Sequence, residues 1–239
     1  MKKNVSIILA CYNDGLSVEE STKRIIDILD TTKYQYEIIL IDDASLDGSK
    51  KAINKIKNKY PTKNIKAIFH EKNVGRGGTV KEGLLKAKGD IAGFLDIDLE
   101  VSENYLPAFI LAIDNGADVA IGSRVYKVQW NALHRYFGSL IYPMLVRKLL
   151  KLPFKDTEAG YKFFKRKKVM DLIKETKDNG WFWDTEIIAR AYSKGQKIIG
   201  IPVLFVRRPE KKSSVKFFHD SFLQLQKLMN FKKEMVKYN

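Results

Sequence analysis

The chain has 239 residues, 45% of them hydrophobic and 30% charged, a composition that indicates a soluble globular protein of one large domain or a domain with an appendage. Its single cysteine excludes an internal disulfide, and its longest uncharged run, the 11 residues Tyr136–Val146, is too short to span a bilayer, which takes about 20 apolar residues. The net charge of +15 fits nucleic acid, an anionic membrane surface or phosphorylated small molecules as partners, and equally a surface that is basic only for solubility.

Apolar strands alternate with amphipathic helices through the first 115 residues. We predict strands where β-branched and apolar residues run together, and helices where apolar residues recur at helical spacing. The alternation predicts an α/β fold, with a mainly parallel sheet and helices on both faces. In chain order the predicted elements are strand 5–10, helix 18–29, strand 37–41, helix 49–60, strand 65–69, helix 79–87 and strand 91–95.

The pattern is looser after residue 115. We divide the chain into a domain of residues 1–216, with halves 1–115 and 116–216, and a basic amphipathic helix in residues 217–239. That helix places Phe218, Phe222, Leu225 and Met229 on one face. The elements predicted in this part are strand 119–121, helix 133–152, strands 162–164 and 197–206, and helix 217–235.

Acidic, aromatic and glycine residues follow the first four predicted strands, in "CYND", "DDASLDGS", "HEKNVGRGG" and "DIDLE". Ligands of parallel sheets bind at the carboxyl ends of the strands, so we expect the site there. In an extended chain Asp96, Asp98 and Glu100 would point the same way, and like charges so close require a cation between them. A divalent cation bound by carboxylates and substrate phosphates satisfies that requirement, although acids at a strand end also serve as solvated or capping residues.

Six stretches occur in order: "ILACYND", "LIDDASLDGS", "NVGRGG", "FLDIDLE", "AIGSR" and "DTEAGYKFF". Together they closely resemble the family 2 glycosyltransferases with the GT-A fold, above all the branch of dolichol-phosphate mannose synthases and polyprenyl-phosphate glycosyltransferases. The resemblance covers roughly residues 4–216. It implies that the half 1–115 binds a nucleotide-diphosphate sugar and that the half 116–216 binds the acceptor.

The resemblance implies roles for residues on the donor side. Tyr12 and Asp14 match the base and ribose pocket, and Asp43 matches the residue that hydrogen-bonds the base, although it also suits a helix cap. Asp98 and Glu100 match the ligands of Mg²⁺ or Mn²⁺, with Glu100 standing where glutamine is usual. Gly75 suits a close approach of the backbone to the nucleotide. The full nucleotide-sugar set implied is Ala10, Tyr12, Asp14, Asp43, Gly75, Arg76, Asp96, Asp98 and Arg208.

On the acceptor side, Arg124, Arg135 and Ser139 match the positions that hold a lipid phosphate, and the planar fork of arginine suits phosphate. Glu186 would be a general base for a hydroxyl acceptor, whereas with a phosphate acceptor, which needs no base, it would orient the sugar. The implied catalytic set is Asp98, Arg124, Arg135 and Glu186, and the residues implied to line the donor and acceptor pockets are Asp156, Lys162 and Trp183.

The predicted function is inverting, metal-dependent transfer of a sugar from a nucleotide-diphosphate sugar to a polyprenyl (dolichyl-type) phosphate. The basic helices 133–152 and 217–235 would hold the enzyme peripherally on the cytoplasmic, inner face of the cell membrane, unless they pack in the core instead. The alternative acceptor is a hydroxyl of a polysaccharide, glycolipid or protein glycan. We expect no nucleic acid, because no aromatic-and-basic recognition motif is visible. The histidines, including His70, have no partners at metal spacing and are interpreted as structural or surface residues.

Overall fold

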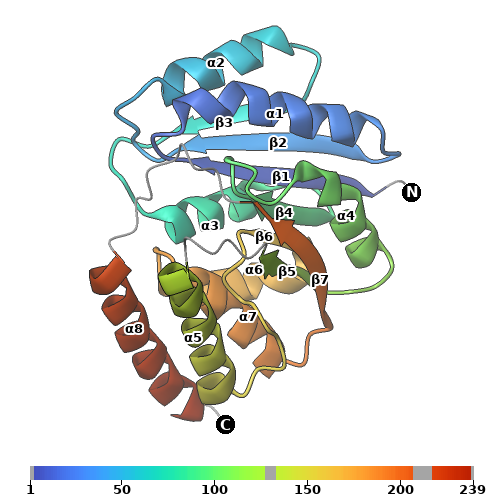
Figure 1. Cartoon of the computed structure of the whole chain (residues 1–239). Helices are drawn as coiled ribbons and strands as arrows, with labels where there is room; N and C mark the ends of the chain where they lie inside the picture. The colour runs from blue at the N-terminus through green and yellow to red at the C-terminus, as the bar shows by residue number, and fades with distance from the viewer. Residues whose placement is uncertain (1–2, 127–132, 207–216, 238–239) are drawn as a thin grey trace.

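A computed structural model describes residues 3–126, 133–206 and 217–237 (Figure 1). At the centre of these residues lies a seven-stranded sheet with the order β3-β2-β1-β4-β6-β5-β7. All neighbouring strands pair in parallel except at β6, which is antiparallel to both its neighbours, so the mainly parallel sheet predicted is confirmed. The strands are β1 (Asn4–Cys11), β2 (Gln35–Asp42), β3 (Ile65–Phe69), β4 (Ile91–Leu95), β5 (Val119–Tyr126), β6 (Tyr161–Lys165) and β7 (Ile198–Phe205).

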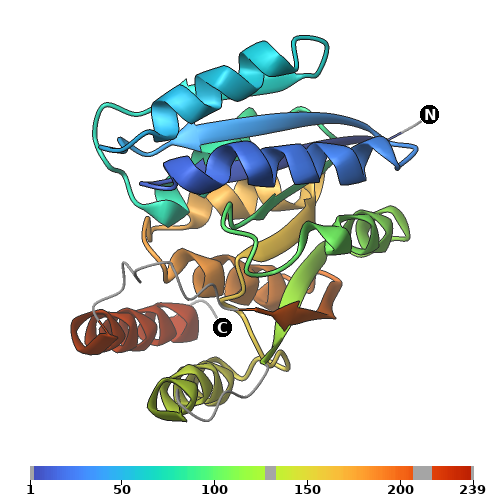
Figure 2. The same ribbon diagram turned by 45° about the horizontal axis from the view of Figure 1, so that its top comes forward.

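Helices cover both faces of the sheet, as predicted (Figures 1 and 2). One apolar core lies beneath α1 (Gly15–Asp30), α2 (Ser49–Lys59) and α4 (Leu106–Asp114), and contains Ile25, Ile53 and Phe109. The core on the other face lies beneath α3 (Arg76–Lys86), α6 (Arg166–Glu175) and α7 (Trp183–Ser193). The sheet is therefore buried on both faces, which explains why its strands are continuously apolar.

The helices α5 (Leu133–Leu150) and α8 (Phe217–Lys237) lie side by side in both views (Figures 1 and 2). A third apolar cluster joins them to α7 and includes Val146, Phe182, Leu228 and Phe231. The face of α8 that packs in this cluster is not the one that carries Leu225 and Met229, which are 37% and 41% exposed. The side chains of Phe218 and Phe222 lie outside the described residues. Across the described part of the chain, no helix combines the length and apolar character needed to cross a membrane.

Three helices were not predicted, and most of the predicted elements have somewhat different bounds. α4, α6 and α7 were missed, and α3 begins at Arg76 rather than at residue 79. The strand predicted at 119–121 continues to Tyr126, so that Arg124 lies within β5. The division of the chain at residue 216 stays an interpretation, although the packing of α8 against α5 and α7 makes it part of the same fold.

Strand register brings the expected site residues to one edge of the sheet. Cys11 pairs with Asp42 at the ends of β1 and β2, and Leu95 at the end of β4 pairs with Tyr161 at the start of β6. The segments that follow β1, β2 and β4, the loop before β6 and the end of β5 therefore lie at the same edge. This is the carboxyl edge at which parallel sheets bind ligands.

Truncation of Phe231 to alanine is expected to lower the free energy of unfolding by about 3 to 5 kcal/mol, because it opens a cavity against the ring of Phe182. The same truncation at Met229, on the exposed side of α8, is expected to cost less than about 1 kcal/mol. Urea unfolding of both variants provides the measurement. Equal and small losses would show that α8 does not belong to the core.

Candidate active site

The three acids after β4 lie in a turn, so the extended conformation predicted for them is wrong. The Leu99 amide donates to the Asp96 carbonyl at 3.1 Å, and Leu99 has a φ of +52°. Its side chain and that of Ile97 are buried, whereas Asp96, Asp98 and Glu100 are partly exposed. The alternation in the sequence therefore holds for burial, because two apolar side chains anchor the turn while the acids between them reach solvent.

Arg76 joins the first of these acids to α7. Its Nε and Nη2 donate to Oδ1 of Asp96 at 3.1 and 2.7 Å, and its Nη1 donates to Oδ2 of Asp184. The guanidinium also lies over the rings of Phe94 and Trp181, with 5.5 and 5.1 Å to the ring centroids. Burial raises the pKa of Asp96, although Arg76 opposes that shift. Arg76 was predicted to bind the nucleotide sugar, and the structure engages it with two protein carboxylates.

Lys162 forms a buried ion pair behind Arg76. Its Nζ lies 2.6 Å from Oδ1 of Asp184, and the two side chains are 0% and 1% exposed. Burial lowers the pKa of Lys162, and the negative charge of Asp184 opposes that shift. Lys162 was predicted to line the donor and acceptor pockets, and this stays a prediction that its fully buried side chain does not favour. Asp184 was not predicted, although it stands two residues before Glu186 in the sequence.

Glu186 and Trp183 also belong to the interior. The Glu186 carboxylate accepts hydrogen bonds from the Lys177 and Asp178 amides at 3.0 and 2.9 Å and from Nη2 of Arg190 at 2.8 Å. Trp183 is fully buried, and its Nε1 donates to Oγ1 of Thr176. The predicted base or sugar-orienting role of Glu186 and the pocket-lining role of Trp183 stay predictions, and these contacts do not favour them, because both side chains hold α7 and its preceding loop in place.

Arg124 and Asp156, predicted for two neighbouring subsites, bind each other. Nε of Arg124 donates to Oδ2 of Asp156 at 2.6 Å and Nη2 donates to Oδ1 at 3.0 Å, which makes a bidentate pair. Burial opposes ionisation of Asp156, but the guanidinium outweighs it and holds the pKa of this carboxyl below its usual value. The pair fixes Arg124 at the end of β5, on the acceptor side of the predicted site.

Asp43 organises the beginning of α3. Its Oδ1 accepts from the Val74 amide at 2.9 Å and its Oδ2 from the Gly75 amide at 3.0 Å, and the side chain is 4% exposed. Asp43 therefore fixes the loop that leads into α3, rather than capping the helix that follows it in the chain. Gly75 has a φ of +88°, and a Cβ there would lie 2.5 Å from the Asn179 carbonyl oxygen. The glycine thus accommodates protein backbone, which is a different reason from the approach of a nucleotide.

His70 bridges two carboxylates beside this loop. Its Nδ1 lies 2.7 Å from Oδ1 of Asp43, and its Nε2 lies 2.8 Å from Oε2 of Glu82. Partial burial alone would lower the pKa of His70, but the hydrogen bonds to both carboxylates outweigh it, and the pKa is raised. Only the protonated ring donates from both nitrogens, so this geometry corresponds to an imidazolium. The interpretation of His70 as a structural residue agrees with these contacts.

The remaining predicted residues stay predictions. Tyr12, 46% exposed, follows β1, and the Oδ2 of Asp14 accepts from its amide at 3.3 Å. Ala10 is partly buried near the end of β1. Arg208 lies outside the described residues, and so do the side chains of Arg135 and Ser139 in α5.

A metal site is only partly formed. In the part of the chain that the structure describes, no group of three or more His, Cys, Asp or Glu side chains is arranged to hold an ion. Asp96 is bound to Arg76, whereas Asp98 and Glu100 are partly exposed, and the Glu100 amide donates to Oδ1 of Asp98 at 3.2 Å. Two carboxylates suit Mg²⁺ where phosphates complete its coordination, so this donor set fits a cation that arrives with a bound diphosphate.

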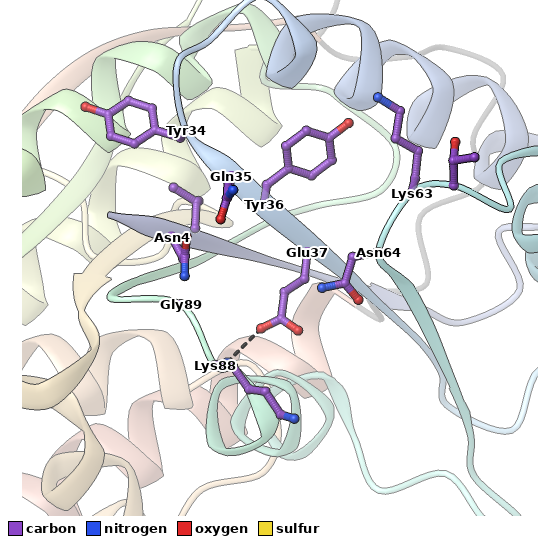
Figure 3. A pocket seen from close by; sticks show the side chains of 11 residues that line it. Asn4, Tyr34, Gln35, Tyr36, Glu37, Lys63, Asn64, Lys88 and Gly89 are labelled. Atoms are coloured by element: carbon purple, nitrogen blue, oxygen red, sulfur yellow. Dashed lines mark hydrogen bonds between the residues drawn. The ribbon is translucent and has the colours of Figure 1, made fainter. Parts of the chain in front are cut away.

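A hollow of about 530 Å³ lies at the opposite edge of the sheet (Figure 3). It is lined by the amino ends of β1 and β2 and by the segments that precede β3 and β4, and Glu37 in it accepts from the Lys88 amide at 2.7 Å. No predicted donor, acceptor or metal residue lines it. We assign it no part in the site, because ligands of parallel sheets bind at the carboxyl edge.

The family model described as "Glycosyl transferase family 2" matches residues 6–173. The chain belongs to this family. Two curated relatives of this family 2 chain are "Glycosyltransferase AglD" of Haloferax volcanii, 28% identical over 204 residues, and "Dolichol-phosphate mannosyltransferase" of Pyrococcus furiosus, 30% identical over 218 residues. The matches cover 83% and 89% of this chain but only 32% and 59% of the relatives, so the chain spans part of their length.

Solved structures confirm the predicted GT-A fold of this family 2 chain. Glucosyl-3-phosphoglycerate synthase from Mycobacterium tuberculosis, in complex with UDP, superposes with a TM-score of 0.70 at 17% identity, covering 97% of this chain and 80% of that one. The mannosyltransferase PcManGT from Pyrobaculum calidifontis, in complex with GDP-Man and Mn²⁺, gives a TM-score of 0.67 at 16% identity, covering 100% and 65%. The resemblance stated from the sequence motifs is thereby confirmed at the level of family and fold.

Replacement of Lys162 by methionine is expected to lower the free energy of unfolding by about 3 kcal/mol, because Asp184 stays buried with one cation fewer. The matched control is Lys165→Met at the exposed end of the same strand, expected to change it by less than about 0.5 kcal/mol. Chemical denaturation compares the two. A Lys162→Met protein as stable as the control would show that Arg76 alone neutralises Asp184.

His70→Gln is expected to destabilise the fold more in acid than in alkali. Because folding raises the pKa of His70 above 6.5, its stabilisation is fully present below that value and is lost as the pH rises through the folded-state pKa. We expect a loss of about 1 to 3 kcal/mol near about pH 5.5 and a smaller loss near about pH 9. Urea unfolding at both pH values measures this difference, and equal losses would contradict it.

Proposed function

We propose that the chain transfers a sugar, with inversion and with a divalent cation, from a nucleotide-diphosphate sugar to a polyprenyl (dolichyl-type) phosphate at the cytoplasmic face of the membrane. One observation carries the proposal. The carboxylate turn after β4, with Asp98 and Glu100, and the arginine at the end of β5, Arg124, lie at the same edge of the sheet. One group suits the diphosphate of a donor and the other the phosphate of an acceptor.

The donor side of the proposal rests on Asp98, Glu100 and Tyr12. Asp98 and Glu100 would hold Mg²⁺ or Mn²⁺, as ions of both kinds accompany UDP in structures of the mycobacterial synthase, which has the same fold. Such an ion stabilises the negative charge that develops on the leaving diphosphate. Tyr12 follows β1 at the same edge of the sheet and would present its half-exposed aromatic ring to the base, with Asp14 close to it for the ribose.

The contacts that Arg124 and Glu186 make within the protein support the acceptor side of the proposal. Arg124 is held in one orientation by Asp156, so little side-chain freedom is lost when it binds a phosphate. Arg135 and Ser139 would complete the phosphate site from α5. A hydroxyl acceptor needs a general base, and Glu186, the base considered for it, is engaged with Arg190 and two backbone amides. This favours a phosphate acceptor, which needs no base.

The membrane part of the proposal rests on the outer faces of α5 and α8. Met144 is 65% exposed on α5, where Arg147 and Lys148 are also exposed, and Met229 lies on the outer side of α8. Exposed apolar side chains beside basic ones suit a surface of anionic lipid. α8 would thus use one face for the core and the other for the membrane.

The test is transfer from GDP-mannose or UDP-glucose to geranylgeranyl phosphate. We expect a product that mild acid cleaves, formed only with Mg²⁺ or Mn²⁺, and a rate about 10²- to 10³-fold lower in Asp98→Asn, which loses a charged cation ligand. Asp171→Asn on α6, with a largely exposed side chain, is the matched control and should keep the full rate. Full activity in excess EDTA would overturn the metal assignment, and an acid-stable product would overturn the phosphate acceptor.

A further inference from the structure

Glu158 lies beside the pair of Arg124 and Asp156 and was not among the residues singled out in the sequence. Its Oε2 is 3.8 Å from Nη2 of Arg124, the same nitrogen that donates to Asp156. Its backbone amide donates to Oδ1 of Asp156 at 3.0 Å, which places both carboxylates on one side of the guanidinium. The Glu158 side chain is 30% exposed and therefore accessible to a ligand.

Two carboxylates share one guanidinium at this point. With both ionised, Arg124, Asp156 and Glu158 together carry a net negative charge, and like charges so close favour retention of a proton on one of them. Asp156 stays ionised, because it has the bidentate pair and three amide donors. Among the residues that the structure describes, the Glu158 carboxylate has no ion pair closer than its 3.8 Å contact with Arg124, so it is the carboxyl that retains the proton.

The wider surroundings of Glu158 act in the same direction. Burial raises the pKa of Glu158 to about 7, with Asp156 and Asp184 adding to the shift and Arg124 and Lys162 opposing it. From α5, Tyr142 also faces this carboxyl, and its own pKa is raised by burial and by the charge of Glu158. Because Asp156 already pairs with Arg124, the guanidinium only partly offsets the rise in the pKa of Glu158.

We propose that Glu158 takes up a proton when the acceptor phosphate binds beside Arg124, so that the site holds this phosphate only with the carboxyl neutral. The inference rests on the proposed function, and specifically on a phosphate acceptor. A phosphate monoester brings up to two negative charges, which an ionised Glu158 would repel, whereas the neutral carboxyl has an O–H that donates to a phosphate oxygen. The proton comes from solvent and returns there when the product leaves, and no covalent bond changes in this step.

A hydroxyl acceptor would require the opposite behaviour of the same residue. Glu158 would then have to be ionised in order to accept the proton of the attacking hydroxyl. With a hydroxyl acceptor the rate of sugar transfer would rise with pH, whereas with a phosphate acceptor the affinity for the acceptor would fall with pH. The direction of the pH dependence, and its loss in a variant that cannot titrate, therefore separate the two chemistries.

The experiment measures binding of geranylgeranyl phosphate to the full chain by calorimetry between about pH 6 and about pH 8.5, in wild type, Glu158→Gln and Glu175→Gln. Glu175 is an exposed carboxylate paired with Lys194 and serves as the matched control. Above about pH 7 we expect the wild-type affinity to fall more steeply than that of Glu158→Gln, by up to about tenfold per pH unit. Ionisation of the phosphate itself affects all three proteins alike, so the difference in slope isolates Glu158.

A wild-type measurement alone also tests the inference. Calorimetry in two buffers of different ionisation enthalpy should show net proton uptake on binding near about pH 7.5, and zero uptake overturns the inference even if Glu158→Gln fails to fold. Equal pH slopes in wild type and Glu158→Gln also overturn it, while the proposed function stands if the acid-labile lipid product still forms. A transfer rate that rises with pH and falls about 10²- to 10⁴-fold in Glu158→Gln identifies a general base, which overturns both.

Discussion

A chain of four alternating charges connects the carboxylate turn to the interior: Lys162, Asp184, Arg76 and Asp96. Four different parts of the sequence supply these groups, and each carboxylate touches at least one cation. A buried charge without a partner is costly. The elements β4, β6, α3 and α7 must therefore come together in one arrangement for these four charges to neutralise one another. The position of the first acid of "DIDLE" therefore depends on residues remote from it in sequence.

The sequence was sufficient for the sheet and for the edge at which the site lies, because apolar strands and the polar residues after them are local patterns. It was insufficient for α7, where residues 183–191 are all buried, the polar ones included, so that polarity in the sequence does not mark an exposed helical face. It was insufficient also for α6, which follows β6 directly with no turn signal between Lys165 and Arg166. α4 is apolar nearly throughout, and its periodicity is correspondingly weak.

The errors within the site have a related cause. Asp184 and Glu186 are two residues apart on α7, so they point to nearly opposite sides of the helix. The motif gives both acids but not the rotation of the helix, and only Asp184 faces Arg76. The pairing of Arg124 with Asp156 was likewise beyond the sequence, since local patterns indicate which residues reach an edge and long-range packing decides which of them touch.

The glycines of "NVGRGG" carry information about inheritance. Gly75 and Gly77 face the backbone of residues 179 and 180, and a side chain at either position would collide with it. Selection acting on this contact would keep both glycines whatever nucleotide the protein binds. In an alignment of relatives, positions 75 and 77 should therefore change only where the length or path of the segment before α7 also changes. Where both positions stay glycine, the reason would be this contact between two parts of the molecule that are distant in sequence.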